Sequence, residues 1–307
     1  MFSSLVRPAA RCMLFLIVAA CLAGCQQRFS FKPAVHVGTT KAPVIGFVFV
    51  PQEYLALQAR LEELFDTRVL FDPGLSADAI LQQLSEGRWQ FAILSAGDYL
   101  SATPRQGIQP LAVSIGRNDR PTMHGLLVAR KDSGVNQITD CKGKRFAFGP
   151  AGDLLYDYAA RAALNNAGVA DADLARELLP QFVVSGRLHL GGRGAEVARV
   201  VAFDPTVPAG VVDEIAFARL PESGGNVIMG PSRDMFTIIG STLDVPDQVV
   251  LAGSGVDPVM SEKLSNYLIK RIKDEPKVCE QMGVRGFVEP SPGVLETARQ
   301  LIPRKTG

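Results

Sequence analysis

The sequence predicts an α/β protein with two lobes. The chain has 307 residues, enough for two folding units at one domain per roughly 100–200 residues. Short apolar runs alternate with amphipathic segments, a pattern typical of sheets flanked by helices. The predicted strands end repeatedly in loops rich in Gly, Ser, Asp and Tyr. Because ligands bind beyond the carboxyl ends of strands in open α/β sheets, these loops are the expected site.

Residues 1–25 are predicted to be a signal peptide. Two arginines precede an apolar run that is shorter than the roughly 20 residues needed to span a bilayer. The run ends in LAGC, which resembles the bacterial lipoprotein lipobox and makes Cys25 the expected site of lipid attachment. The alternative is an ordinary signal peptide with an incidental cysteine. We therefore expect an exported chain held on the extracytoplasmic side of a membrane by a lipid such as palmitate, with inner and outer membrane both open.

The elements of the first half follow from local signals. Residues 26–42 are polar without a sustained period and are interpreted as a tether. Residues 44–50 (VIGFVFV) form an apolar run typical of a buried strand, and residues 51–66 carry apolar side chains at helical spacing. Ser76 is a plausible N-cap for a helix to residue 84. The remaining strands are expected at 68–71, at 91–94 (FAIL, before a turn at 95–98) and at 111–115.

The second half continues the alternation. Residues 124–129 are extended, and the strand 145–148 (RFAF) leads into GPAGD and a helix at 154–167 that Gly168 ends. A strand at 209–212 ends at Asp213. Further extended segments are expected at 181–184, 227–229 and 235–239, and further helices at 194–201, 261–273 and 295–301.

Composition and motifs exclude several functions. Lys and Arg number 32 against 31 Asp and Glu, and aromatic residues are 7% of the chain, so neither a basic surface nor stacking platforms favour a nucleic-acid partner. The sequence has no HExxH, no GxSxG and no phosphate-binding loop. Cys141 and Cys279 lack metal-ligand spacing. We expect no enzyme activity, no cofactor and no metal, and two separate buried thiols rather than a disulfide.

Five segments resemble a known family in order and spacing. They are 44–51, FAILSAGDY at 91–99, LLVARKDS at 126–133, DCKGKRFAF with the following helix at 140–168, and AGVVD at 209–213. Together they are similar to the substrate-binding proteins of phosphate, phosphite and phosphonate ABC transporters, over most of residues 43–270. The resemblance implies the type II periplasmic binding protein fold. Lobe one would comprise 43–125 plus 232–307 and lobe two 126–231, joined by two crossover segments.

One segment departs from the family pattern. The family presents Ser or Thr hydroxyls after RFAF, where a helix N-terminus holds an oxyanion. Here PAGDL at 150–154 has no hydroxyl, and Asp153 would cap the helix itself and repel a phosphonate. The family's His-Asp pair is replaced by Arg193 and Gly194. The fold can thus be kept while the ligand differs from phosphate or phosphonate, although Arg193 leaves an anion contact open.

Eight residues are candidate ligand contacts: Tyr54, Ser95, Tyr99, His124, Gly152, Asp153, Arg193 and Asp213. Each has a simpler alternative. Tyr54 and Tyr99 could equally pack in the core, and Asp153 could act only as a helix cap. Arg193 lies in a GGRG loop where an exposed arginine is the default, and His124 near the crossover is either a hinge or ligand contact or a satisfied half-buried histidine.

The sequence therefore predicts a monomeric, lipid-anchored solute-binding protein that closes on a small-molecule ligand and docks on an ABC permease. Asp213, or its neighbour Glu214, would contact an amine or hydroxyl of the ligand. The alternative is a sensory or scaffolding lipoprotein of the same fold that binds a protein partner. An enzyme on this fold is the third possibility, with no catalytic constellation to support it.

Overall fold

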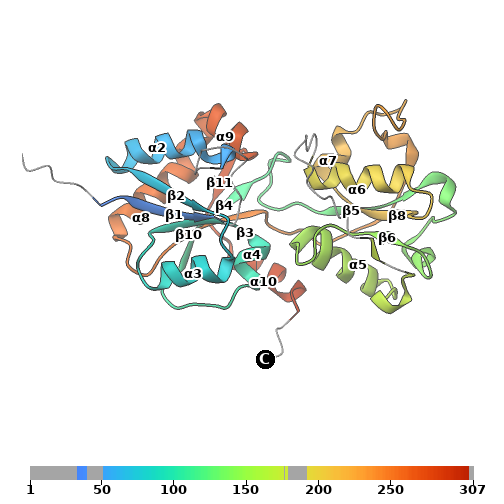
Figure 1. The fold of residues 1–307 in the computed structure, drawn as a ribbon, viewed down its shortest axis with the longest axis horizontal. Coiled ribbons are helices and arrows are strands. Elements are labelled where there is room, and N and C mark those ends of the chain that lie inside the picture. Colours follow the sequence, from blue (N-terminus) through green and yellow to red (C-terminus); the bar gives the residue numbers. More distant parts are fainter. Residues whose placement is uncertain (1–32, 40–50, 176, 179–191, 304–307) are drawn as a thin grey trace, which may run out of the picture. The chain divides into compact units, whose positions relative to one another are not determined.

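A computed structural model describes residues 33–39, 51–175, 177–178 and 192–303. Within these ranges the chain forms two mixed β-sheets, each covered by helices on both faces (Figure 1). The α/β class with two sheets is therefore confirmed. Among the described residues, no helix has both the length and the apolar character needed to span a membrane. The predicted signal peptide, Cys25 and the strands expected at 44–50 and 181–184 lie outside the described residues.

The first sheet has the strand order β11-β4-β10-β3-β1-β2. Its strands are β1 (Val35–Thr39), β2 (Val69–Pro73), β3 (Phe91–Ser95), β4 (Gln109–Ile115), β10 (Gln248–Ala252) and β11 (Gly286–Val288). β1 runs parallel to β2 and β3, whereas β10 is antiparallel to β3 and β4. In Figure 1, α2 (Leu55–Phe65) and α9 (Pro276–Met282) lie on one face and α3 (Ala77–Ser85) on the other. The remaining helices are α4 (Ala96–Ser101), α8 (Pro258–Asn266) and α10 (Pro292–Leu301).

The second sheet has the order β7-β6-β8-β5-β9. Its strands are β5 (Gly125–Arg130), β6 (Phe146–Ala147), β7 (Glu177–Leu178), β8 (Ala209–Asp213) and β9 (Phe236–Ser241). β5 is antiparallel to both β8 and β9. A continuous helical segment, η4 (Leu154–Ala159) and α5 (Ala160–Asn166), lies on one face, while α6 (Gly192–Phe203) and α7 (Glu214–Arg219) lie on the other (Figure 1).

The structure corrects the predicted tether. Residues 35–39 form β1, an inner strand with buried Val35 and Val37, so the tether prediction is wrong for these residues. The strand depends on Gly38, because a Cβ there would lie 2.5 Å from the Trp89 ring and 2.8 Å from Ile80. The Trp89 ring stacks on His36 at 6.5 Å between centroids. Trp89 and Ile80 are distant from Gly38 in the sequence. The local sequence shows only a polar segment, which resembles a linker.

Two further expectations are wrong. The predicted return of the chain to the first lobe at residue 232 is too early, because β9 pairs with β5 in the second sheet. The extended segment predicted at 227–229 is a turn, closed by the backbone pair between Asn226 and Gly230. The helix expected at 194–201 is present within α6, and Cys141 and Cys279 are separate, buried and free, as predicted.

Candidate functional site

A cavity of about 590 Å³ is lined by residues from both sheets and from the segments that connect them. Ser95, Gly97 and Asp98 contribute from the end of β3, and 150–156 and Asp213 from the ends of β6 and β8. Ligand pockets for small molecules typically span about 300–1,000 Å³. We call this cavity the cleft, and it is where strand ends were predicted to form a site.

Asp153 lines the cleft at the start of the η4–α5 helical segment. Its Oδ1 accepts hydrogen bonds from the backbone N–H groups of Leu155 and Tyr156, each at 2.9 Å. Its Oδ2 forms an ion pair with the Arg193 guanidinium. The predicted capping role is therefore present, and two residues that the sequence singled out separately are in contact. The negative charge that a helix N-terminus favours is supplied by the protein itself.

Gly152 and Asp157 shape the turn before this helix. Gly152 has a positive φ of 84°, which only glycine adopts readily, and its N–H donates to Asp157 Oδ2 at 2.7 Å. Asp157 is buried and its Oδ1 accepts from Arg161 Nε at 2.5 Å. These hydrogen bonds fix the shape of the turn, and Gly152 lines the cleft, while its contact with a ligand stays a prediction.

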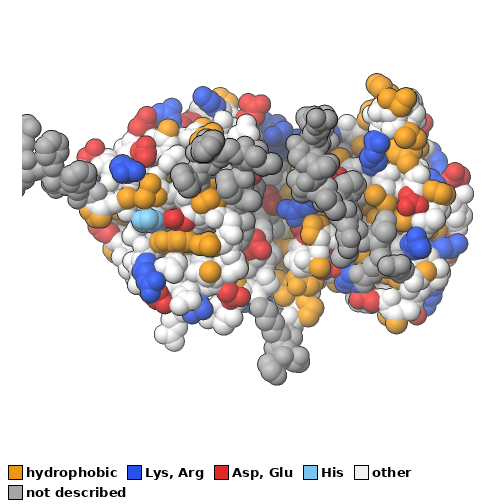
Figure 2. Space-filling view, in the orientation of Figure 1, with side chains coloured by type: hydrophobic (Ala, Val, Ile, Leu, Met, Phe, Trp, Pro, Cys, Tyr) orange, Lys and Arg blue, Asp and Glu red, His pale blue; other side chains and the backbone are white. Residues whose placement is uncertain are grey.

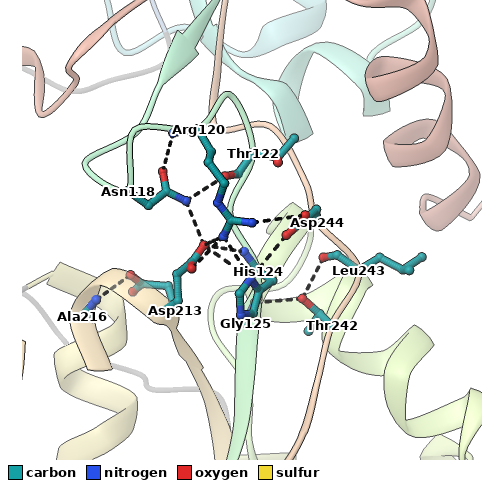
Figure 3. Close-up of polar contacts among 11 residues, drawn as sticks. Asn118, Arg120, Thr122, His124, Gly125, Asp213, Ala216, Thr242, Leu243 and Asp244 are labelled. Carbon is teal, nitrogen blue, oxygen red and sulfur yellow. Dashed lines mark hydrogen bonds and ion pairs between the residues drawn. The ribbon is translucent and has the colours of Figure 1, made fainter. Parts of the chain in front are cut away.

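Asp213 caps α7 and faces the same cavity. Its Oδ1 accepts from the backbone N–H of Ala216 at 2.7 Å, a contact visible in Figure 3, and the Tyr156 hydroxyl donates to its Oδ2. Burial, and then the charge of Asp213, raise the pKa of Tyr156 well above its ordinary value, so the phenol stays protonated as a donor. Gly194 permits this arrangement, since a Cβ there would collide with Asp213 and lie 2.9 Å from the Tyr156 hydroxyl.

The opposite wall comes from the first sheet. Ser95 caps α4, its Oγ accepting from the Asp98 N–H at 3.0 Å. A Cβ at Gly97 would lie 3.1 Å from Leu154 Cβ, so the starts of α4 and of the η4–α5 segment approach closely. Tyr54 lines the cleft although only 1% of it is exposed, and its ring stacks on Phe71 at 5.3 Å between centroids. Tyr54 therefore packs in the core and also lines the cleft.

Tyr99 and His124 are not among the described residues that line the cleft. Tyr99 is half-buried against the hydrophobic core, which matches the alternative interpretation of this residue. Sequence analysis missed Tyr156, Asp247 and Gln248, all of which line the cavity. Tyr156 had one local signal, its position three residues after the cap Asp153, whereas Gln248 begins a strand, β10, that was not predicted. Among the described residues, no group of His, Cys, Asp or Glu side chains is arranged to hold a metal ion.

His124 instead belongs to a polar network between the two connecting segments, 116–124 and 242–247 (Figure 3). Arg120 Nη2 lies 2.6 Å and 2.7 Å from the two carboxylate oxygens of Glu214. His124 Nδ1 lies 3.4 Å from Glu214 Oε1 and 3.3 Å from Asp244 Oδ1. Met123 and Val245 exchange backbone hydrogen bonds of 2.8–2.9 Å between the segments. The network joins both connections to the start of α7.

Replacing Arg120 by alanine is expected to loosen this connection without unfolding either sheet. Glu214 loses the cation that contacts both of its oxygens, an effect of about 1 kcal/mol for a half-exposed ion pair. Backbone amides of 118–124 and 242–245 should therefore exchange with deuterium about fivefold faster, while those of β5 and β10 keep their protection. Arg60→Ala, which removes two ion pairs of 2.7 Å with Glu63 and Glu275, is the matched control. Unchanged exchange at the connections in Arg120→Ala would contradict this role.

Comparisons with known proteins agree with this architecture. The family model described as "ABC transporter, phosphonate, periplasmic substrate-binding protein" matches residues 50–294. The structure of XAC2383 from Xanthomonas citri bound to ATP is similar with a TM-score of 0.65 and 17% identity, over 88% of this chain and 97% of that one.

Two further solved structures have names that mention phosphonate. A binding protein component of an ABC phosphonate transporter from Pseudomonas aeruginosa has a TM-score of 0.60 and 15% identity, over 88% of this chain and 85% of that one. PhnD1 from Prochlorococcus marinus in complex with methylphosphonate has a TM-score of 0.59 and 14% identity, over 87% and 96%. At these identities the likenesses establish a shared fold, that of the type II periplasmic binding proteins.

Proposed function

The chain belongs to the family of periplasmic substrate-binding proteins of phosphonate-type ABC transporters, and we propose that it is a lipid-anchored receptor that closes on a small ligand and delivers it to a permease. The family consists of solute-binding proteins rather than enzymes. The observation that carries the proposal is the cleft of about 590 Å³, to which both sheets contribute strand ends and helix starts. A ligand that contacts both walls stabilises the closed form over the open one.

The lobes of this receptor follow the two sheets. Lobe one would run from β1 through β4 and resume at β10, and lobe two would run from β5 to β9. The paired connecting segments, with the Arg120–Glu214 contact, would act as the hinge. Lipid on Cys25 would keep the monomeric receptor at the membrane that holds its permease and so raise its local concentration there. Tyr54, Ser95, Gly152, Asp153, Arg193 and Asp213 would line the ligand site.

Native mass spectrometry of the full chain, purified in detergent, tests this function. We expect a co-purified molecule of metabolite size that is released on denaturation, because a preformed cleft retains ligand when the closed form is stable. An Asp213→Ala variant that carries no such molecule, and so loses no mass on denaturation, would support the cleft as the site of the ligand. A native chain that is empty under all gentle conditions, and that no solute stabilises against heat, would contradict the proposal.

An exposed apolar turn favours the second function, a lipoprotein that binds a protein partner. Val227, Ile228 and Met229 are 61%, 92% and 80% exposed, and Figure 2 shows hydrophobic side chains at the upper right, over the loop after α7. Asn226 Oδ1 accepts from the N–H groups of Ile228 and Met229, so the turn is held in shape. Contiguous exposed apolar surface is typical of protein interaction sites. A cleft that binds no small molecule would favour this function.

A further inference from the structure

We propose that the cleft takes a small organic cation, a ligand that presents an ammonium group, and not an oxyanion. The inference rests on the proposed solute-binding function and specifies its substrate class. It follows from three features of the described cleft residues: the balance of charge, the partners of Asp213, and a buried acceptor on Gln248 that has no donor.

The described residues that line the cleft include more acidic than basic side chains. They include four aspartates and one basic side chain, Arg193. The acidic residues are Asp98, Asp153, Asp213 and Asp247. Arg193 is paired with Asp153, so the protein itself neutralises the one basic side chain of this described lining. The described lining therefore has more carboxylates than basic side chains, a formal balance that favours a cation over a phosphonate.

The Asp213 carboxylate has no ion pair with a basic side chain among the described residues. Its two hydrogen bonds come from neutral donors, the Tyr156 hydroxyl and the Ala216 N–H. An ionised carboxylate has about four acceptor positions, so each oxygen can accept once more. The existing donors hold the carboxylate in position, and the free acceptor positions suit an ammonium, which offers up to three N–H groups.

Gln248 supplies the observation that points independently to a donor on the ligand. The residue is 6% exposed and lines the cleft. Its Nε2 donates to the Met282 carbonyl at 3.5 Å, the orientation that pairs a donor with an acceptor, and its Oε1 has no hydrogen-bond partner among the described residues. A buried acceptor without a donor is costly. A ligand N–H would satisfy this oxygen, whereas a phosphonate, with acceptors only when fully ionised, would face it unfavourably.

The remaining walls suit an aliphatic body. Ile93, Leu94, Met123, Val245 and Pro246 line the same cavity. An alkyl chain can therefore pack against these side chains while its ammonium reaches the acceptors. The site normally favourable for an anion, the helix start at Leu154, is occupied by the Asp153 carboxylate.

Four small probes of different charge test the assignment by calorimetry on the full chain in detergent. They are putrescine, 1,4-butanediol, succinate and methylphosphonate. We expect putrescine to bind at least tenfold more tightly than the other three, and its affinity to fall as salt is raised. Asp213→Asn should weaken putrescine at least tenfold, since it removes a charge-assisted hydrogen bond. Asp132→Asn, which alters a carboxylate that is 79% exposed, should not.

Thermal unfolding of each variant separates lost binding from lost folding, and Asp98→Asn provides a second cleft variant if Asp213→Asn does not fold. Preference for succinate or methylphosphonate would overturn the cation assignment while leaving the solute-binding function intact. Absence of binding by all four probes would also overturn the cation assignment. The proposed function would then be judged separately, by the co-purified ligand in native mass spectra. Equal weakening by Asp132→Asn would overturn the role of the cleft carboxylates.

Discussion

Replacing Asp153 by serine is expected to raise the affinity of the cleft for methylphosphonate. Asp153 fills the start of the η4–α5 segment with its own carboxylate and neutralises Arg193. Serine removes the charge and releases the guanidinium, while its hydroxyl still caps the helix at a cost of a few tenths of a kcal/mol to about 1 kcal/mol. The N–H groups of Leu155 and Tyr156 can then be shared with an oxyanion.

The expected gain is large because two electrostatic effects act together. Two like charges about 4 Å apart repel by about 4 kcal/mol at an effective dielectric constant of about 20, and replacing Asp153 eliminates that repulsion. A bidentate contact from Arg193 adds a charge-assisted hydrogen bond. We expect methylphosphonate affinity to rise by a factor of about 100 or more in calorimetry.

Two variants make this result specific. Asp153→Glu keeps the negative charge and should leave methylphosphonate unbound. Arg193→Ala in the Asp153→Ser background should remove most of the gained affinity. If Asp153→Ser folds and still does not bind methylphosphonate, the Asp153 carboxylate is not the group that excludes an oxyanion from this helix start.

Replacing Cys25 by serine is expected to abolish incorporation of labelled palmitate into the chain. The lipobox Leu22-Ala23-Gly24-Cys25 predicts that the lipid is attached through this cysteine, and a hydroxyl is not a substitute nucleophile of comparable reactivity. Each buried methylene of an acyl chain contributes about 0.8 kcal/mol to membrane binding, so attached lipid holds the protein at the bilayer. Labelling of growing cells, followed by electrophoresis, measures the effect directly.

The matched control is Cys21→Ser, which changes a cysteine four residues earlier in the same apolar segment. This variant should incorporate label normally. A cleavable leader without a lipobox, fused directly to residue 26, should move the chain from the membrane pellet into the soluble fraction. Label retained in Cys25→Ser, or lost equally in Cys21→Ser, would contradict lipid attachment at Cys25.

Much of the fold could be predicted because its signals are local. Ser76 caps α3 through a 3.3 Å bond to the Ala79 N–H, and Asp153 caps the η4–α5 segment within two to three residues. The apolar run at 91–94 is β3, and AGVVD at 209–213 is β8. Periodicity and capping act over a few residues, so one sequence suffices to find them.

β1, β10 and β11 were not predicted because their signals are not local. Their identity as strands depends on neighbours that are far away in the chain, such as the pairing of Gln248–Ala252 with both β3 and β4. β1 contains a histidine and a glycine, and the segment resembles a polar linker until Trp89 packs over Gly38. Strand pairing of this kind has no signature in a local window.

The candidate site divides in the same way. The α/β class, the family resemblance, the lipobox cysteine, the cap Asp153 and the strand-end Asp213 could all be found from residue order, since each depends on residues adjacent in the chain. The folded arrangement was needed to show that Arg193 neutralises Asp153, that Tyr156 donates to Asp213, and that Gln248 is buried with an unpaired oxygen. Charge compensation and hydrogen-bond satisfaction are properties of atoms in contact, and the chain brings these atoms together only when both sheets have formed.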